Sequence, residues 1–84
     1  PYTTLFRSNM LGQLYYKLED YKAARTQFVI IHTASPNNIN NLLNLAKCNI
    51  KLGDTEEARI NLNDVLNIFP ENEEANDLIK EINR

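Results

Sequence analysis

Few residues of this 84-residue chain are of a type that does chemistry. The sequence contains one histidine, His32, and one cysteine, Cys48. A cysteine nucleophile needs a base beside it, and a metal centre needs several ligands close together. No second histidine or cysteine is present to meet either need. We interpret Cys48 as a small buried residue and His32 as a surface residue near the end of a helix, and we expect no metal and no cofactor.

The acidic residues offer a second kind of chemistry, because two carboxylates can share general acid and base work. The glutamates concerned, however, fall in what we expect to be the first turns of helices, where negative charge offsets the helix dipole. These residues are Glu56, Glu57, Glu71, Glu73 and Glu74. Paired-carboxylate catalysis is the weaker interpretation, and we predict that the chain is not an enzyme.

Composition excludes other classes of function. The net charge is −2, with 43% hydrophobic and 24% charged residues, as in an ordinary globular domain. A chain without excess positive charge is not expected to bind nucleic acid. Apolar runs such as residues 28–31 are far shorter than the roughly 20 residues of a membrane span, so no membrane insertion is expected. The single cysteine slightly favours a reducing compartment such as the cytoplasm, or a compartment to which cysteine content is indifferent.

The pattern along the chain predicts an all-α fold, because apolar residues recur at spacings of three and four and no segment alternates like a strand. Five helices are predicted, at residues 4–18, 21–34, 38–52, 55–68 and 72–83. Asp54 with Glu57 has the form of a capping box, and Gly53 suits the left-handed position after a helix. Glu19 holds the place of Gly53 in the earlier turn, so we expect strain there. Pro70 is expected at the entry to the last helix, with Glu71, Glu73 and Glu74 in its first turn.

The chain also repeats itself at an offset of 34 residues. Pro36 and Pro70 are separated by this distance. Further matched pairs are Leu11 and Leu45, Gly12 and Ala46, Leu18 and Leu52, Asp20 and Asp54, Ala24 and Ala58, Arg25 and Arg59, Phe28 and Leu62, and Ile31 and Val65. Because small residues match small ones and large apolar residues match large ones, the repeat is a packing unit.

The first copy resembles the tetratricopeptide repeat, whose signature has Leu-Gly, Tyr, Ala, Phe and Pro at fixed spacings. The matching residues are Leu11, Gly12, Tyr15, Ala24, Phe28 and Pro36. The resemblance implies an α-solenoid of antiparallel helix-turn-helix repeats. It assigns residues 5–38 to a first repeat and 39–72 to a second, and leaves 73–84 as either a capping helix or the start of a third.

The repeat predicts which residues form the core. We expect these side chains to be buried: Leu11, Tyr15, Ala24, Phe28, Leu45, Ala58, Leu62 and Val65. Asn49 replaces the inward Tyr15 in the second copy. Because a buried amide without partners costs about 1–3 kcal/mol, Asn49 is either hydrogen-bonded inside or turned to the edge.

The opening eight residues, PYTTLFRS, lie where the signature lacks its leading aromatic residue, a position taken by Ser8. They also match, codon for codon, the translation of CCCTACACGACGCTCTTCCGATCT, the end of a widely used sequencing adapter. We therefore expect residues 1–8 to be a non-native artefact, the authentic sequence to begin at Asn9, and the chain to be part of a longer protein. The alternative is a natural start of the first helix.

The resemblance implies a protein- or peptide-binding scaffold, with ligands lying on a concave face formed by the first helix of each repeat. The residues it places there are Asn9, Gln13, Tyr16, Lys17, Asn40, Leu43, Asn44, Lys47 and Lys51. Amides suit a peptide main chain and lysines suit acidic groups, so an acidic or amide-rich peptide is the expected partner. We expect the glutamates to lie away from these lysines. The alternative function is a structural spacer within a larger protein.

Some members of this family clamp a carboxylate at the end of a partner chain with lysines, asparagines and an arginine. Only Asn44 matches that set here. Asn9, Gln13, Glu74 and Leu78 stand at the other positions, which argues against this class of ligand.

Overall fold

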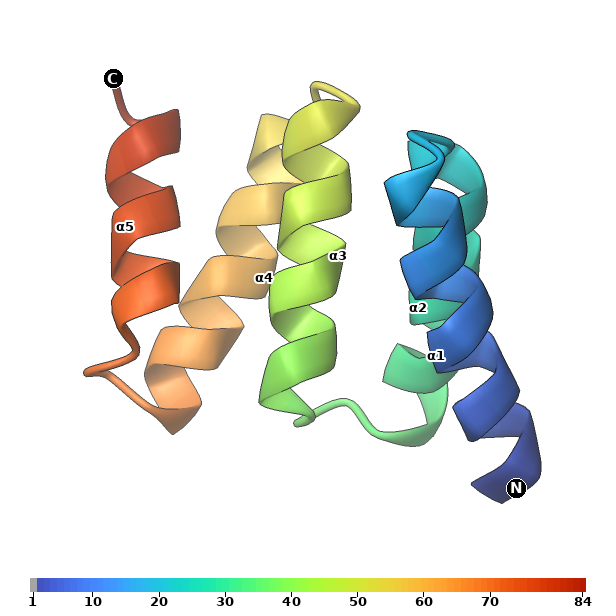
Figure 1. Cartoon of the computed structure of the whole chain (residues 1–84). Helices are drawn as coiled ribbons and strands as arrows, with labels where there is room; N and C mark the ends of the chain where they lie inside the picture. Colours follow the sequence, from blue (N-terminus) through green and yellow to red (C-terminus); the bar gives the residue numbers. More distant parts are fainter. Residues whose placement is uncertain (1) are drawn as a thin grey trace.

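The computed structural model describes residues 2–84, which form five helices and no strand (Figure 1). Neighbouring helices run antiparallel and pack in chain order, and α3 also contacts α5. The all-α prediction is confirmed, and Pro1 lies outside the described residues. The helices are α1 (Tyr2–Lys17), α2 (Tyr21–Ala34), α3 (Ile39–Lys51), α4 (Thr55–Ile68) and α5 (Glu73–Ile82).

The helix ends repeat at the same offset as the sequence. Asn38 and Asn72 cap α3 and α5, because their side chains accept hydrogen bonds from the N–H groups of Asn41 (3.1 Å) and Ala75 (2.8 Å). The last helix therefore begins after Asn72. Pro70 lies at its entry, but the prediction that Glu71 lies in its first turn is wrong, because Glu71 lies in the preceding turn.

The turns within the two repeats have the same backbone form. Gly53 has φ of 82°, and its counterpart Glu19 has φ of 62°, which confirms both the left-handed glycine and the strained glutamate. The capping box predicted for Asp54 is wrong. Asp54 makes no side-chain cap, because its carboxylate instead pairs with Arg25 of α2 at 2.6 Å.

The core consists of two clusters, one centred on Phe28 and one on Leu62. Six of the eight predicted core residues are buried: Ala24, Phe28, Leu45, Ala58, Leu62 and Val65. The prediction is wrong for Leu11 and Tyr15, which are only half-buried. The reason is that α1 packs mainly on α2, whereas α3 has a neighbour on both sides.

Residues 2–8 form the first part of α1, and the helix continues past them without a break. Ser8 is 3% exposed. The serine therefore occupies an inward position that suits the aromatic residue of the signature. The artefact origin of residues 1–8 stays a prediction, as do the repeat boundaries. Among residues 2–84, no helix is both long enough and apolar enough to cross a bilayer.

Candidate binding groove

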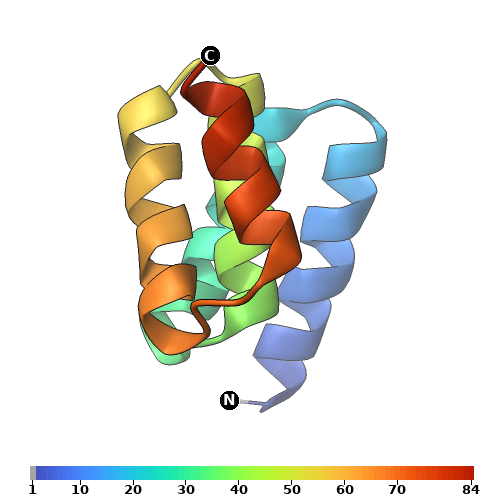
Figure 2. The same cartoon turned by 90° about the vertical axis from the view of Figure 1, so that its left-hand side faces the viewer.

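The surface formed by α1, α3 and α5 is hollowed along its length. Seen from the α5 end, α5 lies in front of α3, with α4 to one side and α1 to the other (Figure 2). A first hollow, of about 430 Å³, lies at the start of α3. Its lining residues are Leu5, Phe6, Asn9, Ile31, Ser35, Asn38, Asn40 and Asn41.

A second hollow, of about 270 Å³, lies at the middle of α3. It brings together six of the nine residues predicted to line the concave face, and adds Glu74 of α5. Those six are Asn9, Gln13, Asn40, Leu43, Asn44 and Lys47. Four of them are amides, and they share the hollow with the buried Leu43.

A third hollow, of about 200 Å³, lies towards the end of α3. Two further predicted residues, Tyr16 and Lys51, line it together with Lys47, Ile50, Leu78 and Glu81. The remaining predicted residue, Lys17, is exposed at the end of α1 and lines none of the three hollows.

Neighbouring hollows share residues, so together they form one surface, which we call the α3 groove. Asn9 and Asn40 line both the first and the second hollow, and Lys47 lines both the second and the third. A 13-residue helix is about 20 Å long at 1.5 Å per residue. An extended peptide rises about 3.3 Å per residue, so about six residues fit along α3.

Charges of both signs face this groove. Lys47 Nζ lies 2.5 Å from Glu74 Oε2, and Glu81 lines the same hollow as Lys51. The prediction that glutamates lie away from the lysines is therefore wrong, because α5 itself borders the groove. The Lys47–Glu74 pair is partly exposed, so its attraction is screened by solvent and contributes little stability.

Aromatic side chains pack against each other at the end of the groove nearest the C-terminus of α3. The rings of Tyr16 and Tyr21 meet edge to face, with centroids 5.1 Å apart, and Lys51 Nζ lies 6.0 Å from the Tyr21 ring centroid. Burial raises the pKa of the Tyr16 phenol, and the nearby Lys51 charge opposes this rise. Tyr16 therefore remains a neutral hydroxyl that can donate or accept a hydrogen bond.

Sequence reasoning missed Glu81 as a groove residue, although the repeat contains the signal. Adding 34 to Asn44 and Lys47 of α3 gives Leu78 and Glu81 of α5, and both line the third hollow. The same offset from Asn40 gives Glu74. Thus α5 presents acidic groups where α3 presents an amide and a lysine.

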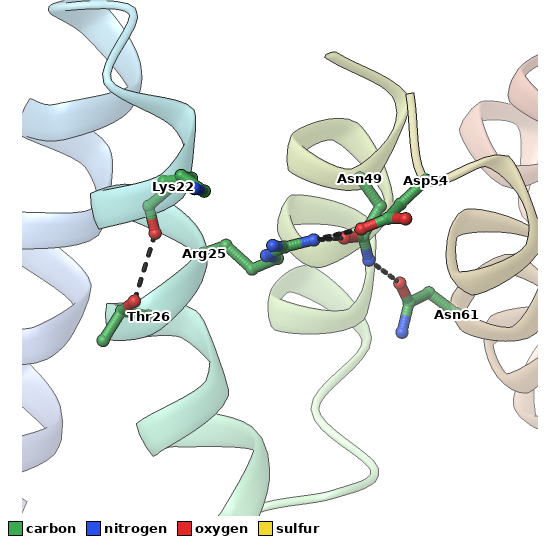
Figure 3. Close-up of polar contacts among 6 residues, drawn as sticks. All are labelled: Lys22, Arg25, Thr26, Asn49, Asp54 and Asn61. Atoms are coloured by element: carbon green, nitrogen blue, oxygen red, sulfur yellow. Dashed lines mark hydrogen bonds and ion pairs between the residues drawn. The ribbon is translucent and has the colours of Figure 1, made fainter. Parts of the chain in front are cut away.

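A polar network on the other side of α3 holds the groove's central helix in place (Figure 3). Arg25 of α2 donates to Asn49 Oδ1 at 2.9 Å, and Asn49 Nδ2 donates to Asn61 Oδ1 of α4 at 2.8 Å. Asn49 is buried with both ends of its amide paired, which confirms that it is hydrogen-bonded inside. This asparagine therefore links α3 to the helices on both sides.

The histidine and the cysteine lie outside the α3 groove. Cys48 is fully buried, and burial raises its pKa to about 11, so the thiol is protonated near neutral pH. His32 lines a separate hollow between α2 and α4. In residues 2–84, no three or more histidine, cysteine, aspartate or glutamate side chains form a group that could hold a metal ion.

Comparison with known families agrees with this geometry. The family model described as tetratricopeptide repeat matches residues 18–82, which is most of the chain. The chain belongs to the tetratricopeptide repeat family. The match runs from the turn before α2 to the end of α5, so it includes the second hairpin entirely. Tetratricopeptide repeats generally serve as protein-interaction scaffolds. The search of curated proteins gave no match.

Proposed function

We propose that this tetratricopeptide repeat chain binds a protein partner by holding an extended segment of it in the α3 groove. The observation that carries this proposal is the group of four amide side chains that line the second hollow of the groove. These are Asn9, Gln13, Asn40 and Asn44, which line it together with Leu43. Each amide both donates and accepts hydrogen bonds, so it can pair with a peptide main chain whatever the peptide's own side chains are.

The charges of the groove bear on which peptide it prefers. Lys47 is already paired with Glu74, so it adds little attraction for an acidic ligand. Lys51 is exposed beside the third hollow and remains the better cation for an acidic group. The favoured ligand is thus an amide-rich segment of about six residues with an acidic residue at the Lys51 end. Such a short contact gives weak affinity, because it buries little surface.

A spacer role is the second candidate, and the Arg25–Asn49–Asn61 network favours it. This network joins α2, α3 and α4 across the two hairpins, and it fixes their relative position. A rigid rod of stacked hairpins separates other domains without binding anything in its groove.

Selection of random seven-residue peptides on the immobilised chain distinguishes the two candidates. A selected peptide is then titrated, by fluorescence anisotropy, with the wild type and with the Asn40→Ala/Asn44→Ala variant. Losing about two hydrogen bonds of roughly 1 kcal/mol each weakens binding by about 10- to 30-fold. If the affinity of the variant stays within twofold of the wild-type affinity, the groove is not the binding site. If no peptide is selected, the spacer role is favoured.

The chain offers a matched control on another face. Asn63 and Asn67 are exposed on α4, and neither lines the α3 groove. The Asn63→Ala/Asn67→Ala variant removes the same two side chains from a helix and should bind the peptide like the wild type. An equal loss in this variant would indicate a general effect on folding.

A further inference from the structure

The hollow between α2 and α4, which we call the α2–α4 hollow, has a volume of about 330 Å³ and shares no lining residue with the α3 groove. Val29 and His32 of α2 line one side of it, and buried Leu45 and Asn49 of α3 lie at its base. Neither α1 nor α5 lines it. Its shape is therefore set by the three central helices and not by the helices at the two ends of the array.

The α4 side of this hollow places a carboxylate at each end of an apolar and an amide side chain. Its residues are Glu57, Ile60, Asn61 and Asp64, whose spacing of three and four collects them on one face of the helix. Seven residues of helix rise about 10 Å, which separates the two acidic residues along the axis. Between them Ile60 is 52% exposed, and Val29 on the opposite side is 47% exposed. The hollow is thus apolar in the middle and acidic at both ends.

The two carboxylates of the hollow are not neutralised by the chain's own cations. No ion pair among residues 2–84 involves Glu57 or Asp64. Arg25 also lines the hollow, but its guanidinium is already paired with Asp54 at 2.6 Å. The hollow therefore has an excess of negative charge, which attracts a cationic ligand.

The amide of Asn61 adds a hydrogen-bond donor that has no partner. Asn61 is 7% exposed, and its Oδ1 accepts a hydrogen bond from Asn49 at 2.8 Å. Its Nδ2 points away from Asn49 and makes no hydrogen bond within residues 2–84 (Figure 3). On the α2 side of the hollow, His32 Nδ1 is likewise buried without a partner. Because an interior donor without an acceptor is unfavourable, a ligand that supplies an acceptor to Asn61 gains free energy.

We propose that the α2–α4 hollow is a second binding site, which takes an extended segment of a partner protein with a basic residue two positions before and two positions after an apolar one. The basic residues pair with Glu57 and Asp64, and the apolar side chain covers Val29 and Ile60. A main-chain carbonyl of the segment accepts a hydrogen bond from Asn61 Nδ2.

The dimensions of an extended chain agree with this arrangement. Alternate residues of an extended chain point to the same side, and residues four positions apart are separated by about 13 Å. Flexible lysine side chains at these positions reach carboxylates that are about 10 Å apart along α4. A free polyamine fits less well, because ammonium groups offer no acceptor to Asn61.

The probe is the peptide Gly-Lys-Ser-Leu-Ser-Lys-Gly, amidated at its C-terminus and labelled with a fluorophore at its N-terminus. We expect it to bind the intact chain in an anisotropy titration at low ionic strength, and to bind more weakly as salt screens the charges. A second peptide, with glutamine in place of both lysines, should bind about 4- to 25-fold more weakly, because each exposed ion pair is equivalent to about a two- to fivefold change in affinity. Absence of binding, or equal binding of the two peptides, would overturn the proposal.

Variants of the chain test the two carboxylates. Glu57→Gln/Asp64→Asn removes both charges with little change in side-chain shape, and it should weaken binding of the lysine peptide by the same 4- to 25-fold, about as much as removing the lysines. Glu56→Gln is the matched control, because Glu56 precedes Glu57 on α4 but does not line the hollow. Its affinity should stay within twofold of the wild-type affinity. Equal losses in the two variants would mean that the peptide responds to overall charge, and they would overturn the assignment.

Side-chain amide signals in nuclear magnetic resonance spectra locate the peptide on the wild-type chain without any substitution. The Nδ2 signals of Asn61 should shift as the lysine peptide is added. Those of Asn63, which is exposed on the same helix and does not line the hollow, should stay in place. Shifts of Asn40 and Asn44 without a shift of Asn61 would place the peptide in the α3 groove and overturn the proposal.

Two more measurements separate this site from the α3 groove and from a site for amines. The Asn40→Ala/Asn44→Ala variant should bind the lysine peptide like the wild type, so this proposal and the groove proposal fail independently. Spermidine carries ammonium groups on an apolar chain but has no acceptor, so it should not displace the peptide when present at equal concentration. Displacement would mean that the hollow binds amines through charge alone, contrary to the proposal.

Discussion

Cys48 illustrates how one residue's surroundings set its chemistry. It lies at the α2-facing side of α3, fully buried, where the first repeat has the exposed Leu14. Burial disfavours the thiolate and raises the pKa from the ordinary 9.0 to about 11, while the nearby Arg25 charge opposes the rise. The side chain therefore behaves as a small apolar residue, as its lack of a neighbouring base predicts from sequence.

The raised pKa makes folding stability depend on pH in the alkaline range. The folded chain keeps its thiol proton at pH values where the unfolded chain has lost it, so this stabilisation is complete below pH 9. It is lost as pH rises from 9 to about 11, with a slope of at most about 1.4 kcal/mol per pH unit. Urea unfolding at pH 8, 9 and 10 measures this decline. Cys48→Ala should show a shallower decline, and an identical one would assign the effect to other groups.

At the scale of helices, the approach of α1 to α2 depends on Gly12. A Cβ at this position would lie only 2.6 Å from Phe28 Cε1, well inside van der Waals contact. The second repeat has a larger residue, Ala46, on α3 and a smaller one, Leu62, on α4. In the first hairpin a glycine faces a large phenylalanine, and in the second an alanine takes the place of the glycine and a leucine that of the phenylalanine.

Gly12→Ala should destabilise the chain by about 1–3 kcal/mol, because overpacking against the Phe28 ring exceeds the roughly 1 kcal/mol gain in helix propensity. The midpoint of urea unfolding is the measurement. The Gly12→Ala/Phe28→Leu variant reproduces the pairing of the second repeat and should be more stable than the sum of the two single changes predicts. Strict additivity would show that the two positions do not share one space.

At the scale of the whole molecule, Asn49 couples the two hairpins. Its amide accepts from Arg25 of the first and donates to Asn61 of the second, in a buried setting. Arg59 repeats half of this arrangement by bonding Asn83, which ties the end of α5 to α4. An arginine–asparagine pair thus joins α2 to α3 and another joins α4 to the end of α5, in addition to apolar contact.

Replacing Asn49 by alanine should lower the free energy of unfolding by about 1–3 kcal/mol, since Asn61 loses its partner in the interior. Asn63→Ala, on the exposed side of α4, should change it by less than about 0.5 kcal/mol. Thermal unfolding followed by circular dichroism tests both. Equal stability of Asn49→Ala and the wild type would mean that water replaces the lost amide at no cost.

The sequence by itself determined the features that depend on neighbouring residues. Helix ranges, the strained Glu19 and the buried Ala24 and Phe28 follow from apolar spacing and from the 34-residue repeat. The resemblance to the family placed nine residues of α1 and α3 on one surface, and eight of them line the hollows of the α3 groove. These patterns act along the chain and need no knowledge of distant contacts.

Only the tertiary structure decided which side chains meet across helices. Asp54 leaves its capping role because Arg25 reaches it from α2, and Lys47 has an acidic neighbour because α5 brings Glu74 to it. The half-burial of Leu11 and Tyr15 likewise depends on α1 being at one end of the array. Such pairings depend on distances of a few ångströms between segments far apart in sequence, and local spacing does not encode those distances.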